Sequence, residues 1–403
     1  MKYFGVGLFF FIWLYLACFS REKIVRSKFF ENELSVDSIM NWKFEDLKNS
    51  VQIADGDIKQ ALVYSFINIK SHEGFPLIED SLCHFLYLSS QVSSFSVAGD
   101  FNKWNPKADS SSHLTGTNLH YISKSFPLDA RLDYKMIVDS VWILDPLNPR
   151  TVWGGFGPNS EIIMPEYQQA WEVGLNDSVP QGTLVEDSIE SKILGRVQNV
   201  IIYLPPGYAE ATIRYPTFYV NDGEEYVQLG SMVNILNNLQ SANLIEPLIV
   251  IFIDPVERMN EYTLNEKYLK MLKLELIPFI DKNYRTISKA ETRGMLGASL
   301  GGLTSLYTGL QLSDLFGKVA GQSSAIQWDN QKIFHLFQEY PLRDIEIYLD
   351  WGTYEGLDSL SNRFVQLLEE KGYSVKYNVY NEGHSWGNWR AHTDEILKTF
   401  WGN

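Results

Sequence analysis

The sequence predicts an α/β fold: a domain with a mostly parallel sheet in the C-terminal half, preceded by a β-sandwich domain. From residue 196 onward, apolar β-type runs such as NVIIYLPPGY and PLIVIFIDP alternate with helical stretches such as SLSNRFVQLLEEKG. Alternating strands and helices are typical of a parallel sheet that helices cover on both faces. Residues 76–165 contain short alternating runs separated by turns, at the spacing of a β-sandwich. A chain of 403 residues also exceeds one ordinary core.

Composition and charge narrow the class of protein. Hydrophobic residues make up 45% of the chain and aromatic residues 14%, which excludes a disordered protein. The formal net charge is −15 and no cluster of Lys and Arg occurs, so nucleic acid is not an expected partner. The two cysteines, Cys18 and Cys83, lack the spacing of a metal site, and we expect neither a metal nor a cofactor.

Residues 1–19 have the features of an export signal. Lys2 precedes an apolar core from about Val6 to Leu16, and small residues follow. The alternative is a membrane anchor, for which this apolar run is short. Leu-Ala-Cys ending at Cys18 leaves open a lipoprotein signal with an acylated Cys18, although Tyr15 stands where a bacterial lipobox usually has leucine. We expect an exported bacterial protein, either periplasmic or attached to a membrane through Cys18.

Two further segments connect these parts. Residues 20–75 have mostly helical apolar spacing and predict a helical arm, with Ser35 as a candidate N-cap. Residues 166–195 predict a linker and a leading strand. The α/β domain then occupies residues 196–403.

The candidate nucleophile is Ser299, in the stretch RGMLGASLGGLTSLYTG. A G-x-S-x-G match alone is weak, because glycine and serine are common enough to produce it by chance. Here an apolar strand end precedes the motif and a helix-forming stretch follows it. Gly297 and Gly301 leave room for a tight turn, and the helix N-terminus favours negative charge at the serine. The alternative is an ordinary serine in a glycine-rich loop.

A serine hydroxyl is a poor nucleophile unless a base takes its proton. The C-terminal domain offers His335, His384 and His392. His335 and His392 lie in predicted helices, whereas His384 follows the last predicted strand, in YNEGHSWGNW. Open α/β sheets place reacting groups at the carboxyl ends of their strands, and the order serine, acid, histidine fits this chain. His384 is therefore the predicted base.

The acid should follow the penultimate strand, in IYLDWGTYEGLDSL. Asp350 is expected within that strand, which leaves Glu355 and Asp358 in the loop. Asp358 is well placed to cap the next helix, so Glu355 is preferred and Asp358 is the alternative. The carboxylate would orient His384 and stabilise its imidazolium form.

An oxyanion needs backbone N–H donors. Leu300 N–H, directly after the nucleophile, is the first predicted donor. The second is expected in FYVNDGEEY, where Glu224 N–H is preferred and Gly223 N–H is the alternative. The competing interpretation of Asp222-Gly223 is an ordinary turn.

Six motifs resemble those of a known family: LPPGY, YVNDGEEY, ELIPFIDKNYRT, GASLGG, LDWGTYEG and NEGHSWGNWR. Over residues 196–403 the sequence resembles the esterase family that includes enterochelin esterases, feruloyl esterases and mycolyltransferase-like proteins. The resemblance implies an α/β-hydrolase domain and serine ester hydrolysis, and the match of GTYEG to the acid-bearing loop of the family implies Glu355. Many relatives carry Asp directly after the histidine, where this chain has Ser385.

Residues 76–165 resemble early-set, immunoglobulin-like modules that precede such hydrolases and also bind starch or glycogen. VAGDFNKWNP, LDYKMIVDSVWILDPLNP and GPNSEIIM carry this likeness. In glycan-binding relatives two tryptophans, a lysine and an asparagine hold the sugar, and stacking on flat indoles suits sugar rings. The matching positions are Trp104, Trp142, Lys135 and Asn159. The same tryptophans also pack internally in modules that bind no sugar.

These observations predict an exported serine carboxylesterase, similar to enterochelin esterases, that works through an acyl-enzyme on a small-molecule or glycan-linked ester. A siderophore trilactone, a feruloyl-type polysaccharide ester and a small acyl ester all stay open. One alternative is an acyltransferase of the same fold, similar to mycolyltransferases. Another is a glycan-binding surface protein with a degenerate hydrolase domain. The candidate substrate contacts are Asp222, Tyr226, Tyr354, Trp386 and Trp389.

Overall fold

The computed structural model describes residues 39–403. The predicted export signal, Cys18 and Ser35 lie outside the described residues. The chain divides into two compact units: the part up to Gly74 together with residues 113–119, and residues 75–112 together with 120–403. In the described part of the chain, none of the helices combines the length and the apolar character that crossing a membrane requires.

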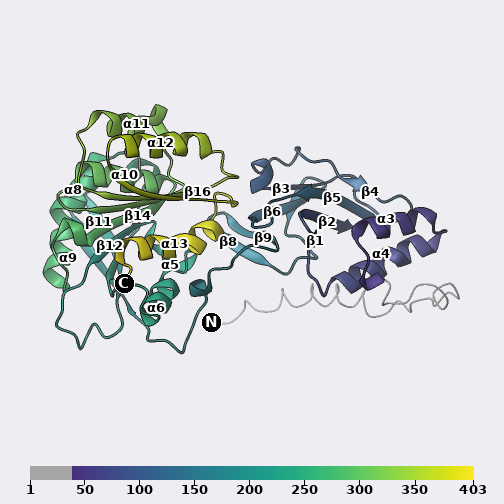
Figure 1. Ribbon diagram of the computed structural model, residues 1–403, viewed down its shortest axis with the longest axis horizontal. Helices are drawn as coiled ribbons and strands as arrows, with labels where there is room; N and C mark the ends of the chain where they lie inside the picture. The colour runs from purple at the N-terminus through teal and green to yellow at the C-terminus, as the bar shows by residue number, and fades with distance from the viewer. Residues whose placement is uncertain (1–38) are drawn as a thin grey trace, which may run out of the picture. The chain divides into compact units, whose positions relative to one another are not determined.

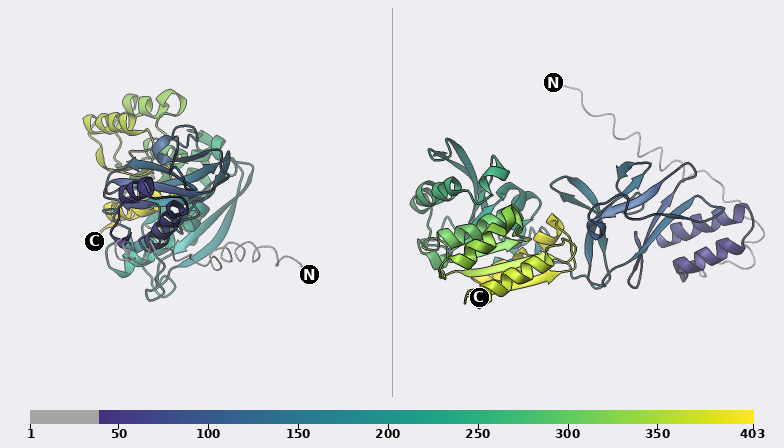
Figure 2. Two further views of the ribbon diagram at one scale, coloured as in Figure 1. Left: turned by 90° about the vertical axis from the view of Figure 1, so that its right-hand side faces the viewer. Right: turned by 90° about the horizontal axis from the view of Figure 1, so that it is seen from above.

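The first unit contains a pair of helices, as the sequence predicts. These are α3 (Phe44–Ile53) and α4 (Asp57–Lys70), which lie side by side in Figure 2. Each helix buries one apolar stripe, and the rings of Phe44 and Phe66 meet at 6.3 Å between centroids. Apolar residues three and four apart share one face of a helix, which is why these stripes form.

The second unit begins with a β-rich part. One sheet has the strand order β1–β2–β5–β4, and the other has the order β3–β6–β9–β8 with β7 paired to β6. A buried cluster that includes Phe85, Val97, Leu132 and Ile162 forms the core of this part. The strands are β1 (Leu77–Glu79), β2 (Leu82–Leu88), β3 (Phe95–Gly99), β4 (Ser112–His113), β5 (Leu119–Ser125), β6 (Arg131–Val138), β7 (Val141–Ile143), β8 (Thr151–Gly154) and β9 (Gly157–Ile163).

The α/β part is built on a mixed eight-stranded sheet with the order β10–β11–β13–β12–β14–β15–β16–β17. The pairs β10–β11 and β11–β13 are antiparallel, and every later pair is parallel. The strands are β10 (Thr183–Ser191), β11 (Arg196–Leu204), β12 (Thr217–Asn221), β13 (Ile249–Ile253), β14 (Arg293–Ala298), β15 (Lys318–Gln322), β16 (Glu346–Gly352) and β17 (Ser374–Tyr380).

Helices cover both faces of this sheet (Figure 1). Successive residues of a strand point to opposite faces, so on β12 Tyr219 joins one buried cluster while Phe218 and Val220 join the other. The first face packs against α8 (Glu266–Met271), α9 (Ile277–Asn283), α10 (Leu300–Gln311), α11 (Trp328–Glu339) and α12 (Asp358–Glu370). The second packs against α5 (Gly223–Gln228), α6 (Met232–Ser241) and α13 (Trp386–Trp401).

The strand order reverses direction at β12. From β12 the chain moves to β13 on one side and then to β14 on the other. In open α/β sheets, ligands bind outside the carboxyl ends of the strands at such a switch point. The strands β12, β14, β16 and β17 are parallel, so the loops that follow them lie at this same edge, and we expect the functional site there.

The first prediction concerns Gly297, the last but one residue of β14. A Cβ atom at this position would lie 2.3 Å from the backbone carbonyl carbon of Gly301, which cannot move without displacing α10. We expect Gly297→Ala to lower the free energy of unfolding by about 2 kcal/mol or more, measured by urea denaturation. Gly174→Ala is the matched control, because its Cβ would meet no atom closer than 3.8 Å. Equal unfolding free energies for the two variants would contradict the close packing of strand and helix.

Candidate active site

Ser299 occupies a strained turn between β14 and α10. Its φ of 57° and ψ of −115° lie outside the regions that residues with a side chain normally adopt. Its N–H donates to Gln322 O at 2.8 Å, and its carbonyl accepts from Ala325 N–H at 3.0 Å. These bonds to the end of β15 and to the segment after it hold the backbone in this conformation, so Ser299 lies directly before α10.

His384 and Glu355 are in direct contact. His384 Nδ1 lies 2.8 Å from Glu355 Oε2, and the Glu355 side chain is only 1% exposed whereas that of His384 is 42% exposed. The other carboxylate oxygen, Oε1, accepts from Ser323 Oγ and from Gly352 N–H, each at 2.7 Å. Asn388 Nδ2 adds a longer contact of 3.3 Å. One oxygen is thus fixed by the protein, and the other is left for the imidazole.

The remaining candidate acid and bases have other partners. Asp358 is the first residue of α12, and its carboxylate accepts from Trp351 Nε1 at 2.7 Å. The expectation that Asp358 caps this helix is wrong, because the N-cap position is Leu357 and no side chain caps the helix. His392 lies on α13, where its Nε2 is 2.6 Å from Glu382 Oε1. His335 lies on α11 beside the ring of Phe334. Glu355 is therefore the carboxylate that the fold brings to His384.

Two consecutive residues, the last of β15 and the one that follows it, connect the serine turn to the His–Glu pair. Gln322 binds the backbone of Ser299, and Ser323 binds both Glu355 and the indole Nε1 of Trp389, the latter at 2.8 Å. The ring of Trp389 meets that of His384 edge-on at 5.0 Å. Among residues 39–403 no direct hydrogen bond joins the Ser299 hydroxyl to His384. Such contacts are often long before a substrate binds.

The backbone donors differ in part from the sequence prediction. Leu300 is the first residue of α10, where an N–H has no acceptor within the helix. Glu224 N–H, in contrast, donates to Asp254 Oδ1 at 2.7 Å. The preference for Glu224 as second donor is therefore wrong, because the loop after β13 supplies an acceptor that the sequence did not reveal. Gly223 N–H is left, and a Cβ there would lie 2.5 Å from the Phe252 carbonyl carbon.

Asp222 is also wrongly predicted, as a substrate contact. Its side chain is 3% exposed and forms two bonds with Arg258, Nε to Oδ1 at 2.7 Å and Nη2 to Oδ2 at 2.8 Å. Burial raises the pKa of this carboxyl, and Arg258 acts against that rise. The pair lies against the serine turn, since a Cβ on Gly301 would be 3.0 Å from Asp222 Oδ2. The Asp222 carboxylate supports the turn instead of facing a ligand.

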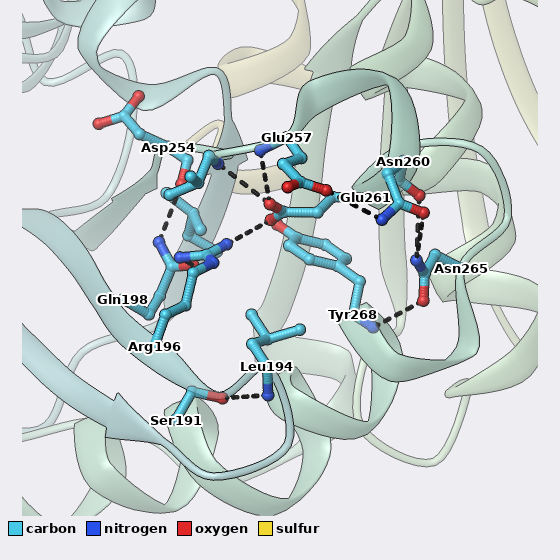
Figure 3. A network of polar contacts seen from close by, with 12 residues as sticks. Ser191, Leu194, Arg196, Gln198, Asp254, Glu257, Asn260, Glu261, Asn265 and Tyr268 are labelled. Carbon is cyan, nitrogen blue, oxygen red and sulfur yellow. Dashed lines mark hydrogen bonds and ion pairs between the residues drawn. The ribbon is translucent and has the colours of Figure 1, made fainter.

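Arg258 is a residue that the sequence reasoning missed, although it follows β13 at the carboxyl edge of the sheet. The loop that carries it is held by Glu261, which accepts from Arg196 Nη2 at 2.6 Å and from Glu257 N–H at 2.8 Å (Figure 3). Gln198 Nε2 donates to Asp254 O at 2.9 Å in the same network. The network fixes α7 (Arg258–Glu261) and thereby the position of the Arg258 guanidinium.

The predicted aromatic substrate contacts are mostly core residues. Tyr226 is fully buried and its hydroxyl donates to Gln322 Oε1 at 2.9 Å, so the prediction that it contacts substrate is wrong. Trp386 and Trp389 are 4% and 7% exposed and pack against each other edge-on. Trp389 packs against the ring of His384. Tyr354, which directly precedes Glu355, is half-buried. Large aromatic residues near a motif are more often packing than contact residues.

The four predicted sugar contacts lie in the β-rich part. The rings of Trp104 and Trp142 are nearly parallel, with centroids 6.5 Å apart, and Trp142 is 44% exposed. Trp104 Nε1 donates to the buried Asp100 at 3.0 Å. Asn159 Nδ2 donates to Asp133 at 3.0 Å, so part of its donor capacity is used internally. Lys135 lies on β6, where it pairs with Ala98 of β3, and it is partly buried.

Comparisons with known proteins agree with this architecture. A family model described as "Putative esterase" matches residues 191–400. The chain is 28% identical over 277 residues to the iron(III) enterobactin esterase of Escherichia coli K12, covering 64% of this chain and 67% of that protein. It is 25% identical over 283 residues to an endo-1,4-beta-xylanase/feruloyl esterase of Xylanibacter ruminicola, covering 66% of this chain and 38% of that protein.

A solved structure extends the likeness over most of the chain. The enterobactin esterase of Shigella flexneri has a TM-score of 0.68 at 22% identity, covering 81% of this chain and 94% of that one. At this identity the comparison shows a shared fold. The coverage exceeds the part matched by the family model, so the β-rich part also has a counterpart there.

The second prediction concerns the Asp222–Arg258 pair. Because the pKa of Asp222 is already raised in the folded state, that state holds its proton more tightly than the unfolded chain, and stability falls as pH rises. Arg258→Met removes the counter-charge and raises this pKa further. We expect a small loss of unfolding free energy at pH 5 that grows to about 1–2 kcal/mol at pH 8, since Arg258 is partly exposed.

The control for this prediction is the double variant Asp222→Asn/Arg258→Met, which carries no titrating group at the pair. The double variant should lack the fall in unfolding free energy with rising pH that the titration of Asp222 causes in the wild type. The rest of its pH dependence should match the wild type. Urea denaturation at pH 5 and pH 8 measures both. A deficit of Arg258→Met that is the same at the two pH values would show that Asp222 does not titrate.

Proposed function

The chain belongs to the "Putative esterase" family and is an ester hydrolase, and from this premise we propose that Ser299, His384 and Glu355 form its catalytic triad. The observation that carries the proposal is the 2.8 Å contact between His384 Nδ1 and Glu355 Oε2 at the same sheet edge as the strained Ser299. A base that is oriented by a carboxylate, next to a serine on a sharp turn, is the arrangement that acyl transfer to serine requires.

The first half of the reaction forms an acyl-enzyme. With Nδ1–H bonded to Glu355, the lone pair of His384 Nε2 is free to take the proton of Ser299 Oγ. Oγ then bonds to the ester carbonyl carbon, and the carbonyl oxygen becomes an oxyanion. Leu300 N–H and Gly223 N–H are the proposed donors to this oxyanion. Each belongs to the first residue of its helix, α10 or α5, where an N–H has no carbonyl acceptor within the helix. The imidazolium of His384 gives its proton to the alcohol oxygen as the ester C–O bond breaks, which completes the acyl-enzyme.

The second half releases the acid. Water loses a proton to Nε2 as its oxygen bonds to the acyl carbon, and the same two backbone donors stabilise the second oxyanion. The bond between the acyl carbon and Ser299 Oγ then breaks, His384 returns the proton to Oγ, and the carboxylic acid leaves. If a sugar or lipid alcohol took the place of water, the same residues would transfer the acyl group instead, which is the alternative of an acyltransferase.

For the substrate we propose an ester with an aromatic acyl group or a siderophore-type lactone. Support comes from relatives that are named iron(III) enterobactin esterase and feruloyl esterase, and whose matches exceed the hydrolase domain in length. The Arg258 guanidinium, 37% exposed beside the serine turn, is a cation that an anionic substrate would meet. A panel of aromatic and aliphatic nitrophenyl esters tests this part, and a strong preference for aliphatic esters would count against it.

We further propose export and an early-set, immunoglobulin-like identity for the β-rich part. Export is supported by Lys2 and the apolar run of residues 6–16, and lipidation of Cys18 by the preceding Leu-Ala. The two-sheet arrangement with exposed Trp142 supports the module. A glycan-binding surface protein with an inactive hydrolase domain is the competing function, and it requires affinity for an insoluble glucan without labelling of Ser299 by a fluorophosphonate.

The third prediction tests the nucleophile. Ser299→Ala should lower kcat for a short-chain nitrophenyl ester by about 10⁴-fold or more and abolish fluorophosphonate labelling, because no other group can form the acyl-enzyme. Ser305→Ala is the matched control: this serine lies on the same helix, and its hydroxyl donates to Gly301 O at 3.0 Å. Wild-type turnover by Ser299→Ala would refute the proposed function.

The fourth prediction separates the two acids. Glu355→Gln removes the charge that stabilises the imidazolium of His384, and we expect kcat to fall by about 10²–10⁴-fold. Asp358→Asn is the control, since that carboxylate binds Trp351 Nε1 and not the histidine. It should keep kcat within a few-fold of wild type. Steady-state kinetics on the same ester measures both variants, and the reverse order of effects would reassign the acid.

A further inference from the structure

The segment that carries His384 is enclosed by side chains from the β-rich part. Gly383 and Gly387 flank it, and neither could carry a side chain. A Cβ on Gly383 would lie 2.0 Å from Asp100 Cγ, and a Cβ on Gly387 would lie 2.0 Å from Arg131 Cζ. Residues 75–112 and 120–403 form one compact unit, so these contacts lie within it.

Arg131 is the central residue of this contact. It begins β6, and its side chain is only 2% exposed. Nε donates to Glu161 Oε1 at 2.6 Å, Nη1 lies 2.8 Å from Asp133 Oδ1, and Nη1 also donates to Ser385 Oγ at 3.2 Å. Glu382 Oε2 lies 4.0 Å from Nη1. A guanidinium held by several acceptors in a dry environment has one orientation, which a flexible surface charge would not have.

Main-chain contacts join the same two segments. Arg131 N–H donates to Asn381 O at 3.1 Å, and Arg131 and Glu382 form an isolated parallel bridge. Asn381 Nδ2 donates to Asp129 Oδ1 at 2.8 Å. The loop after β17 is therefore fixed to the start of β6 on the side that precedes His384.

The contact continues from Ser385 to the acid. Ser385 Oγ accepts from Asn388 N–H at 3.4 Å as the N-cap of α13. Asn388 Nδ2 in turn donates to Gly383 O at 3.0 Å and to Glu355 Oε1 at 3.3 Å. Arg131 binds Ser385, and Asn388 links Ser385 to Gly383 and to the Glu355 carboxylate. The residues on both sides of His384 are thus connected to Arg131.

We propose that Arg131 is a positioning residue for His384, and that the β-rich part thereby completes the active site of the hydrolase domain. The proposal rests on the triad proposed above. Arg131 does not touch the reacting atoms; it fixes Ser385 and the loop after β17, so that the imidazole stays on Glu355 and reaches the serine. A displacement of about 1 Å at a catalytic group can cost about 100-fold in rate.

The test compares two buried arginines, Arg131→Met and Arg293→Met. Arg293 is also 2% exposed and is ion-paired to Asp281 at 2.9 Å, but it lies at the amino end of β14, opposite the site. We expect Arg131→Met to lower kcat for the short-chain ester by about 100-fold with KM changed by less than about 3-fold. Arg293→Met should lower thermal stability but keep kcat. Both are assayed well below their melting temperatures.

A second readout reports the position of the imidazole itself. The proton between His384 Nδ1 and Glu355 should give a far-downfield proton NMR signal in the wild type, and we expect this signal to be lost or shifted in Arg131→Met but kept in Arg293→Met. If Arg131→Met does not fold, Ser385→Ala takes its place, with an expected fall in kcat of about 10-fold. Arg131→Lys, which keeps the charge but reaches fewer acceptors, should recover part of the activity.

The outcomes separate this inference from the proposed function. If Ser299→Ala is inactive and Arg131→Met and Arg293→Met have the same kcat and the same NMR signal, the triad stands and the positioning role of Arg131 is refuted. If Arg131→Met alone loses kcat and the signal, the inference is supported. If Ser299→Ala keeps wild-type turnover, the proposed function fails first and the inference fails with it.

Discussion

The proposed active site depends on one hydrogen bond, between His384 Nδ1 and Glu355 Oε2 at 2.8 Å. Several neighbouring groups fix the carboxylate end of this bond. Ser323, Gly352 and Asn388 occupy the other oxygen of the carboxylate. Because hydrogen bonds to a buried carboxylate are directional, the remaining oxygen has one available direction, and the imidazole takes it. The ring is then turned so that its second nitrogen faces away from the acid.

Several charged groups are buried beside this site. Arg131 and Asp133 are buried next to the partly buried Glu161, and burial, with the charge of Asp133 adding to it, raises the pKa of Asp100 to about 7. Buried charges are costly compared with apolar side chains of the same size. The large apolar clusters on both faces of the sheet supply the stability that tolerates this cost. Strain at Ser299 belongs to the same pattern, since functional sites are where strain is retained.

Several predictions about single residues failed because another segment of the chain supplied a partner. Glu355 was preferred over Asp358 because Asp358 was expected to cap the next helix, but Leu357 is the N-cap of α12 and the Asp358 carboxylate binds Trp351 Nε1. Glu224 was preferred as a donor, but Asp254, thirty residues away, takes its N–H. Tyr226 was expected near the substrate, but its hydroxyl donates to Gln322 in the interior. No periodicity or motif in the sequence around Glu224 or Tyr226 predicts these partners.

The sequence by itself determined the alternation of strands and helices, the glycine-flanked Ser299, and the order of the proposed nucleophile, acid and base, because each of these follows from local patterns along the chain. Only the tertiary structure decided which groups meet. Arg131 and Ser385 are 254 positions apart, and Arg258 reaches Asp222 across 36. A contact of that kind depends on how two strands and their loops pack in three dimensions, and a side chain's burial or pairing is set by that packing and not by its neighbours along the chain.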